Sequence, residues 1–319
     1  METNQNPVQE HPAQVIAPET AQPKPQPVPT SEQPSEQLTP QPQSAKLLYN
    51  PEETAQIVKH LTNGIFNPEY ILLFGSLAGG TPHSEAMTYD LIIVVRETPA
   101  YNWLQAKRDL RYMMPYRQRE VSYINLYVCS LSYIQSHNTP FLYYAHKEGV
   151  LIYCKDHFHF RRPKRLCDFA GAYCDAKLYY DTFLSLGLQF MQQAKDAMTG
   201  KPNVRLAAFS SAQAAIYFYK TLYYVYHGED FDMYDFVVMH ERMRTLSTKL
   251  MLLLDDNHID HIFTVPCLKR FLESARYDLK FEIHPFELKM HMERVESMGK
   301  IVQSYCNSRL ELYKSQCES

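Results

Sequence analysis

Two short apolar runs in the first third of the chain are each bounded by turn residues. Residues 71–74 and 91–95 are aliphatic and too short for helices, so the pattern predicts two buried strands. Residues 121–129 alternate between apolar and polar positions and are rich in β-branched and aromatic side chains, which predicts a third strand. A helix is expected from Pro51 up to a turn at Asn63, ahead of the first strand.

The pattern then changes period. Residues 141–153 predict a short helix, a turn at Lys147-Glu148-Gly149 and a final short strand. Beyond them, apolar side chains recur at helical spacing, with short turns between the segments. Helices are expected at 168–197, 203–227, 239–254, 265–276 and 285–312. Long helices joined by short turns predict an antiparallel bundle.

The first 48 residues have a different composition. They are dominated by Pro, Gln, Glu, Thr and Ser, and they have too few large apolar side chains to offset the entropy lost on ordering. We therefore expect a disordered Pro/Gln-rich tail at 1–48, a sheet-containing domain at 49–158 and a helical bundle at 165–315. The expected fold class is α+β, with a small mixed sheet followed by an all-α part.

Composition narrows the functional classes. The chain has 319 residues, of which 45% are apolar, and a formal net charge of −3. This balance gives no electrostatic reason for broad nucleic-acid binding, although a local basic patch stays open. There is no run of eighteen apolar residues and no apolar N-terminal leader, so we expect a cytoplasmic protein without membrane contact. The seven cysteines form no CxxC pair, which favours reduced thiols over a zinc knuckle or a disulfide framework.

The candidate chemistry lies between the first two strands. Gly75 and Ser76 follow the first strand directly, and Gly79 and Gly80 come soon after. Small residues let a backbone approach a ligand closely and direct N–H groups at an anion. Asp90 opens the second strand. Glycine and serine are suited to holding phosphates, and a carboxylate is suited to holding a cation.

These residues resemble the minimal nucleotidyltransferase domain of the polymerase-beta-like superfamily. The family signature is an apolar strand, Gly-Ser, a small-residue turn and then Asp-x-Asp leading a second strand, and Gly75, Ser76 and Asp90 match it. The resemblance implies that Gly75 and Ser76 bind a nucleoside triphosphate, that Asp90 holds Mg²⁺, and that a nucleotidyl group moves to a hydroxyl.

The chain departs from this signature at two acids. Thr88 stands where the first carboxylate of the pair belongs, and the third strand, which in the family often supplies another carboxylate, holds Ser122, Tyr123 and Asn125 instead. Glu120, just before that strand, is the acid best placed to stand in as a catalytic residue, and Glu85 is a further candidate. A site for two metal ions needs several oxygens to neutralise the charge, so these losses weaken it.

The helical half resembles the HEPN domain, an all-α nucleotide-binding or RNA-cleaving module often fused to minimal nucleotidyltransferases. The match is carried by short strings in order along the chain: Ala208-Phe209, Gln213-Ala214-Ala215, Lys220, His240, Leu246, Ala275-Arg276-Tyr277 and Phe281. Lys220 and Arg276 are the nucleotide-binding candidates here, because their cations can meet phosphate. The alternative is that both brace neighbouring helices. RNA-cleaving members carry an Arg, then four to six intervening residues, then His, and no arginine has that spacing before His240.

Aromatic residues crowd one predicted helix, at positions 217, 218, 219, 223, 224 and 226. They occupy most of the helix circumference, so some should meet another surface, either the first domain or a second copy of the chain. A stacking platform for nucleic acid is the alternative. Two functions stay open: a transferase that binds a nucleoside triphosphate with Mg²⁺, or a catalytically degenerate module for nucleotide binding or protein interaction.

Overall fold

The computed structural model describes residues 49–80, 88–97, 106, 109–110, 123–162, 167–230, 235–243, 246–254 and 264–318, and the structural statements below concern these residues. They all belong to one compact unit of the chain. The tail expected at 1–48 lies outside them, as do Glu85, Glu120 and most of 101–122.

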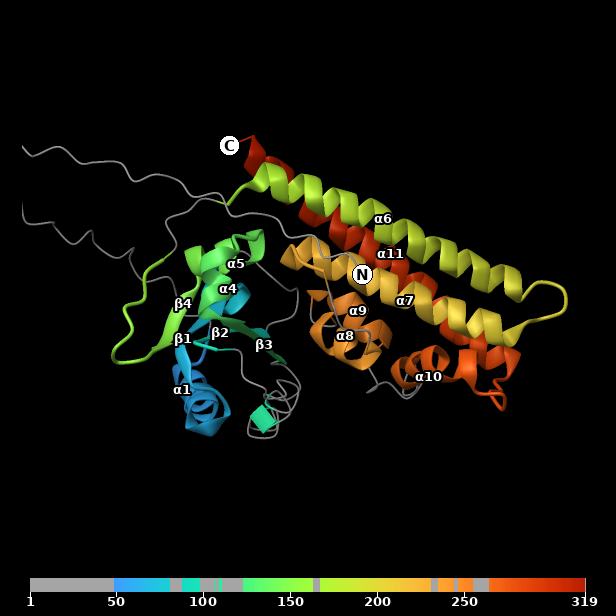
Figure 1. Ribbon diagram of the computed structural model, residues 1–319, viewed down its shortest axis with the longest axis horizontal. Helices are drawn as coiled ribbons and strands as arrows, with labels where there is room; N and C mark the ends of the chain where they lie inside the picture. The colour runs from blue at the N-terminus through green and yellow to red at the C-terminus, as the bar shows by residue number, and fades with distance from the viewer. Residues whose placement is uncertain are drawn as a thin grey trace, which may run out of the picture. The chain divides into compact units, whose positions relative to one another are not determined.

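A small mixed sheet forms the first part of the fold (Figure 1). Its strands are β1 (Pro68–Phe74), β2 (Thr88–Val95), β3 (Tyr123–Ser130) and β4 (Val150–Cys154), in the order β3-β2-β1-β4. β1 is antiparallel to both β2 and β4, whereas β2 is parallel to β3. A mixed four-stranded sheet followed by helices confirms the expected α+β class.

The two central strands are buried along their whole length. Their continuous apolar runs are explained by burial on both faces of the sheet. Ile71, Leu91 and Ile93 face one core together with Ile57 of α1 (Pro51–His60). The opposite face, which carries Tyr70, Leu72, Ile92 and Tyr127 among others, packs on α5 (Pro140–Glu148).

Gly149 ends α5 and turns the chain into β4, as the sequence predicts. Its φ is −67°, so its role is not to adopt a left-handed conformation. A Cβ at this position would lie 2.2 Å from the carbonyl oxygen of Ala145, and glycine is needed for this close approach. The short helix α4 (Leu131–Ser136), which the pattern did not predict, begins where the Ser130 hydroxyl accepts a hydrogen bond from the amide of Tyr133 at 3.1 Å.

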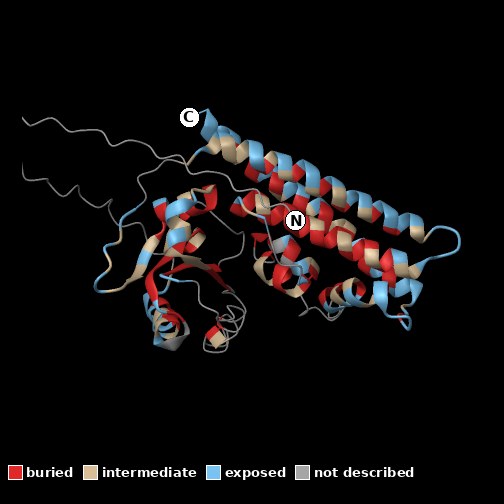
Figure 2. Cartoon of the chain, viewed as in Figure 1, coloured by how far each residue is buried: buried red, intermediate tan, exposed pale blue. Residues whose placement is uncertain are grey.

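Three long helices build the second part: α6 (Phe169–Ala197), α7 (Val204–His227) and α11 (Pro285–Cys317). The first two match the predicted ranges to within one residue at each end. α7 is the most buried of the three (Figure 2), because α6, α11 and the shorter α8 (Phe236–Met243) and α10 (Thr264–Tyr277) surround it. The ring of Phe218 lies between two glycines, Gly187 of α6 and Gly299 of α11, whose small size lets the helices approach.

The single helix expected at 239–254 is instead two helices, α8 and α9 (Thr248–Leu254). The Ser247 hydroxyl accepts a hydrogen bond from the amide of Leu250 at 3.1 Å. A serine in this position begins a new helix, because it satisfies an amide that has no partner within the helix. The apolar periodicity continues across this break and hides it in the sequence.

The aromatic side chains of α7 find most of their partners within the chain. The ring of Tyr224 stacks on Tyr179 of α6 with centroids 3.5 Å apart, and Tyr217 stacks on Phe190 at 5.5 Å. Tyr223, near the end of the helix, stacks on His227 at 4.4 Å. A contact between two copies through this helix would use the half-buried edges of Tyr217 and Tyr224.

Candidate functional site

The predicted site residues on the strands meet at one end of the sheet. Phe74, the last residue of β1, is opposite Asp90 in the antiparallel pair, so Gly75 begins the turn beside Asp90. Asp90 is in turn opposite Asn125 in the parallel pair of β2 and β3. Thr88 precedes Asp90 by two residues, and side chains two apart in a strand point to the same face. The strand pairing therefore brings Thr88, Asp90 and Asn125 together.

These three side chains form a hydrogen-bonded cluster. The carboxylate of Asp90 is fully buried, with 0% of the residue exposed. Its Oδ2 accepts a hydrogen bond from Thr88 Oγ1 at 2.8 Å, and its Oδ1 accepts one from Asn125 Nδ2 at 2.7 Å. Hydrogen bonds to an ionised carboxylate each contribute about 1.5–3 kcal/mol and favour its charged form. Of the three side chains in this cluster, Asp90 alone is acidic.

The turn after β1 is held in shape by its own hydrogen bonds. Gly75 has φ 73° and Gly79 has φ 75°, in the region that favours glycine. The amides of Ala78 and Gly80 both donate to the carbonyl oxygen of Gly75, at 3.1 and 3.2 Å, and the amide of Gly79 donates to that of Ser76 at 3.2 Å. The amides of Gly79 and Gly80, which were expected to be available to an anion, are therefore used within the turn. Ser76 and Leu77 supply the first amides of the 3-10 helix that follows Gly75.

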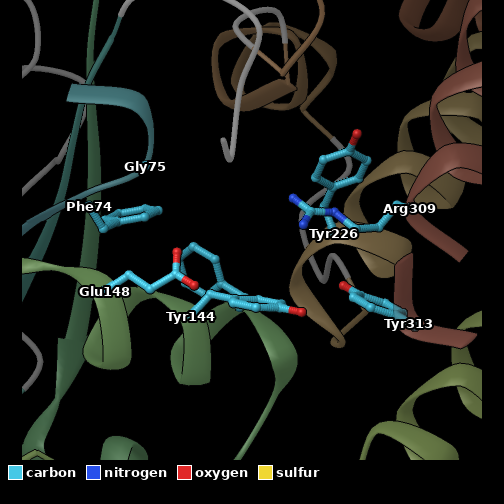
Figure 3. Close-up of a pocket in the computed structure, with 8 residues that line it drawn as sticks. Phe74, Gly75, Tyr144, Glu148, Tyr226, Arg309 and Tyr313 are labelled. Carbon is cyan, nitrogen blue, oxygen red and sulfur yellow. The ribbon is translucent and has the colours of Figure 1, made fainter. Parts of the chain in front are cut away.

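A narrow cleft lies beside this turn (Figure 3). Phe74 and Gly75 line it from the sheet, and Tyr144 and Glu148 line it from α5. Residues of α7 and α11 complete the wall: Tyr226, Arg309 and Tyr313. Its cavity volume is about 10 Å³, which is the space of a single water molecule. A Cβ on Gly80 would lie 2.8 Å from Glu148 Oε2, so this glycine lets the acid lie against the turn.

Arg309 brings a positive charge to the cleft from a buried position, with 7% of the residue exposed. Its guanidinium carbon lies 4.3 Å from the ring centroid of Tyr226. Within the described residues, Arg309 forms no ion pair and no hydrogen bond, and the buried hydroxyl of Tyr144 has no hydrogen-bond partner. Burial of a guanidinium without a carboxylate is costly unless another group compensates it. The cleft therefore holds two donors, the Arg309 guanidinium and the Tyr144 hydroxyl, together with one carboxylate, that of Glu148.

A second polar cluster lies where β3 and α4 meet the end of α7. Glu229 accepts a hydrogen bond from Tyr223 at 2.7 Å and another, shorter one from Tyr133. Burial and this carboxylate hold the pKa of both tyrosines above its ordinary value, so both stay protonated donors. The neighbouring Tyr127 also has a raised pKa, because of its burial first and of the charge on Asp90 second. These hydrogen bonds fasten α4 to the end of α7 through neutral phenols.

The other two predicted nucleotide-binding residues, Lys220 and Arg276, do not line this cleft. Lys220, on α7, pairs with Asp230 at 3.3 Å and lies over the ring of Phe183 at 5.6 Å. Arg276 is exposed at the end of α10, with its guanidinium 5.0 Å from the ring centroid of Phe209. Both arrangements match the bracing alternative. The catalytic candidate Glu120 lies outside the described residues.

Sequence reasoning missed Arg309 and Tyr144. A signal was present for the arginine, because it follows Val302 and Cys306 on the apolar stripe of α11 and precedes Tyr313 on the same stripe. A charged residue on the buried stripe of a helix needs a partner or a ligand. Nothing comparable marks Tyr144, which is one tyrosine among many.

No protein-family model matches the sequence, and a search of curated proteins finds no match. The described helices include none that is long and apolar enough to cross a membrane. All seven cysteines are free thiols in the structure.

Proposed function

We propose that this chain is a nucleotidyltransferase-like protein fused to a HEPN-like bundle, and that it binds a nucleoside triphosphate without efficient nucleotidyl transfer. The resemblance of Gly75, Ser76 and Asp90 to the family signature supports the nucleotide. The cleft beside Gly75 supports it independently, because Arg309 places a buried cation next to the turn. The phosphates would lie between the turn and Arg309, and the cleft has to widen to admit them.

The observation that carries the loss of transfer is the cluster around Asp90. Two metal ions about 3.5–4 Å apart require several anionic oxygens. Thr88 and Asn125 stand on either side of Asp90 and donate hydrogen bonds to its two carboxylate oxygens. The N–H group of Asn125 and the O–H group of Thr88 both point at the carboxylate. They therefore compete with a cation for the same oxygen lone pairs. The cluster is thus satisfied without a metal ion.

A second candidate function is favoured by the size of the cleft. A cavity of about 10 Å³ does not admit a triphosphate as it stands. A module that contacts another protein, with neither nucleotide nor metal, would need no wider cleft. This alternative predicts that no nucleoside triphosphate binds at all.

The test is incubation of the purified full chain with Mg²⁺ or Mn²⁺ and each labelled nucleoside triphosphate, with binding and label transfer measured together. We expect binding of at least one nucleotide with no more label on the protein than an Asp90→Ala variant shows. Transfer that vanishes in Asp90→Ala would contradict the loss of catalysis and revive the transferase. Failure of every nucleotide to bind would contradict nucleotide recognition and leave the protein-interaction module.

A further inference from the structure

A separate group of metal-ligating side chains lies in the helical part, between α10 and α11. Cys267 of α10 and Glu287 and His291 of α11 each offer one ligand atom, and these atoms all lie within 4.8 Å of one another. Glu287 and His291 are four residues apart and thus share a face of α11. The distance between His291 Nε2 and Glu287 Oε1 is 3.9 Å. None of these residues belongs to the cleft beside Gly75.

The environment of His291 points to a ligand. The residue is 4% exposed, and its Nδ1 atom is buried without a hydrogen-bond partner in the described structure. A buried ring nitrogen without a partner loses its hydration and gains nothing in return, so such atoms are rare unless a ligand satisfies them. Of the two ring nitrogens, Nε2 lies 3.9 Å from Glu287 Oε1 and Nδ1 has no partner in the described structure, so no group outside the cluster holds a ring nitrogen.

We propose that Cys267, Glu287 and His291 bind one Zn²⁺ ion. A thiolate, an imidazole and a carboxylate are a ligand set that zinc accepts, with bonds of about 2.0–2.3 Å. Tetrahedral bonds of that length place the ligand atoms about 3.2–3.6 Å apart, so binding requires them to approach by about 1 Å. The exposed side chain of Glu287 can make that movement by changing rotamer.

Three protein ligands leave the fourth position of a tetrahedral ion for water. Binding releases the thiol proton of Cys267, so the bound ion carries one thiolate and one carboxylate that together balance its charge. Two arginines lie close enough to act on these side chains, and each is engaged elsewhere: Arg294 donates a hydrogen bond to the hydroxyl of Thr264, and Arg270 donates one to the carbonyl oxygen of Glu282. The ion would link α10 to α11, because Cys267 lies on the first helix and the other two ligands lie on the second. The positions of these three residues in the sequence did not suggest a metal site.

The experiment is a titration of the full chain with Zn²⁺ against a chromophoric chelator, and with Co²⁺ as a spectroscopic probe. We expect one ion per chain and, with Co²⁺, a thiolate-to-metal charge-transfer band. Cys267→Ser should abolish that band. Cys267→Ser and His291→Gln should each weaken Zn²⁺ binding at least about 100-fold, since even the loss of a residue that only supports a ligand costs up to about 100-fold.

The matched controls are Cys174→Ser and Cys317→Ser, which remove exposed free thiols outside the cluster and should leave the affinity unchanged. Because Glu287 is exposed, Glu287→Gln should keep the fold, and it should still weaken Zn²⁺ binding. Far-UV circular dichroism separates loss of a ligand from loss of the fold. Equal Zn²⁺ affinity in wild type and Cys267→Ser, or a charge-transfer band that survives in it, would overturn the proposal.

Discussion

Asp90 is a buried carboxylate that depends on the two side chains beside it. Its carboxylate lies at the mouth of a buried strand, where an ionised group is stable only with strong hydrogen bonds. Thr88 and Asn125 supply these hydrogen bonds, one from β2 itself and one from the neighbouring strand β3. The described cluster places two donors, and no further acid, against this carboxylate. This arrangement is the physical basis for the proposed binding without transfer.

Placing acids at these two positions should create a metal requirement. We expect the double variant Thr88→Asp/Asn125→Asp to lose about 3–5 kcal/mol of unfolding free energy without Mg²⁺, because it places uncompensated charges in a buried cluster. Millimolar Mg²⁺ should restore most of the lost unfolding free energy. Thermal denaturation with and without Mg²⁺ measures both effects.

The control for the double variant is Thr182→Asp/Asn63→Asp, which makes the same two substitutions at exposed positions. Its unfolding temperature should not depend on Mg²⁺. If Mg²⁺ gives the Thr88→Asp/Asn125→Asp variant no more stability than it gives this control, the three positions do not form a cation site.

The packing of α6, α7 and α11 is decided by small residues at close approaches. A Cβ at Gly187 would lie 2.6 Å from the ring of Phe218, and one at Gly299 would lie 2.7 Å from it. Phe218 is 1% exposed and is thus enclosed from both sides. Neither glycine has a positive φ, so it is the space and not the backbone conformation that requires glycine here.

Alanine at either glycine should therefore destabilise the bundle. Alanine gains about 1 kcal/mol of helix propensity over glycine, but overpacking costs about 1–3 kcal/mol, and a ring held from two sides cannot move away. We expect Gly187→Ala and Gly299→Ala each to lower the unfolding free energy in urea. In a Phe218→Leu background, the same substitutions should be neutral or stabilising. Equal losses in both backgrounds would show that the ring does not set the spacing.

The sequence predicts best those helices and strands whose ends are marked by turn residues. α6 and α7 follow from uninterrupted periodicity between turn residues, and the structure places them within a residue of the prediction. β1 begins at Pro68, earlier than the apolar run. The division of 239–254 into two helices depends on one capping hydroxyl, that of Ser247, within a continuous apolar pattern.

The site was predictable to the extent that it lies on neighbouring strands. Gly75, Ser76 and Asp90 were found because a turn and the strand beside it are close in sequence. Arg309 is more than 200 positions away from them, and only the folded bundle brings it to the cleft. Single-sequence patterns report local structure, and they do not report which distant helix closes a pocket.

At the scale of the whole molecule, the junction between sheet and bundle is built around a neutral histidine. His227, the last residue of α7, contacts the rings of Phe141 at 4.7 Å and Tyr127 at 5.3 Å between centroids. Burial holds the pKa of His227 well below its ordinary value, and the charges of Arg242 and Arg309 lower it further.

This junction should weaken in acid. The unfolded chain protonates His227 near pH 6.5, whereas the folded chain does not. The stability from the neutral form is therefore complete above pH 6.5, and it falls by up to about 1.4 kcal/mol per pH unit as the pH drops below that value. His227→Phe should reduce this slope in urea unfolding between pH 7.5 and 5. It should not remove the slope, because burial also lowers the pKa of His146 and His291.

The exposed His137 offers the control for this measurement. His137→Phe should leave the dependence of the unfolding free energy on pH as it is in the wild type. A slope that His227→Phe does not change would mean that the junction does not depend on the protonation state of His227.

The central claim is that phosphates bind in the cleft between the Gly75 turn and Arg309. The most direct test is calorimetric titration of the wild type, Arg309→Gln and Arg309→Lys with the nucleoside triphosphate that binds most tightly, and with inorganic triphosphate. Arg161→Gln, at an exposed arginine away from the cleft, is the matched control. We predict that Arg309→Gln weakens binding about 10–150-fold, equivalent to about 1.5–3 kcal/mol for a hydrogen bond to a charged group, and that Arg309→Lys recovers part of it. Unchanged affinity in Arg309→Gln, with a loss in Lys220→Gln or Arg276→Gln instead, would contradict the account and place the nucleotide on the helical bundle.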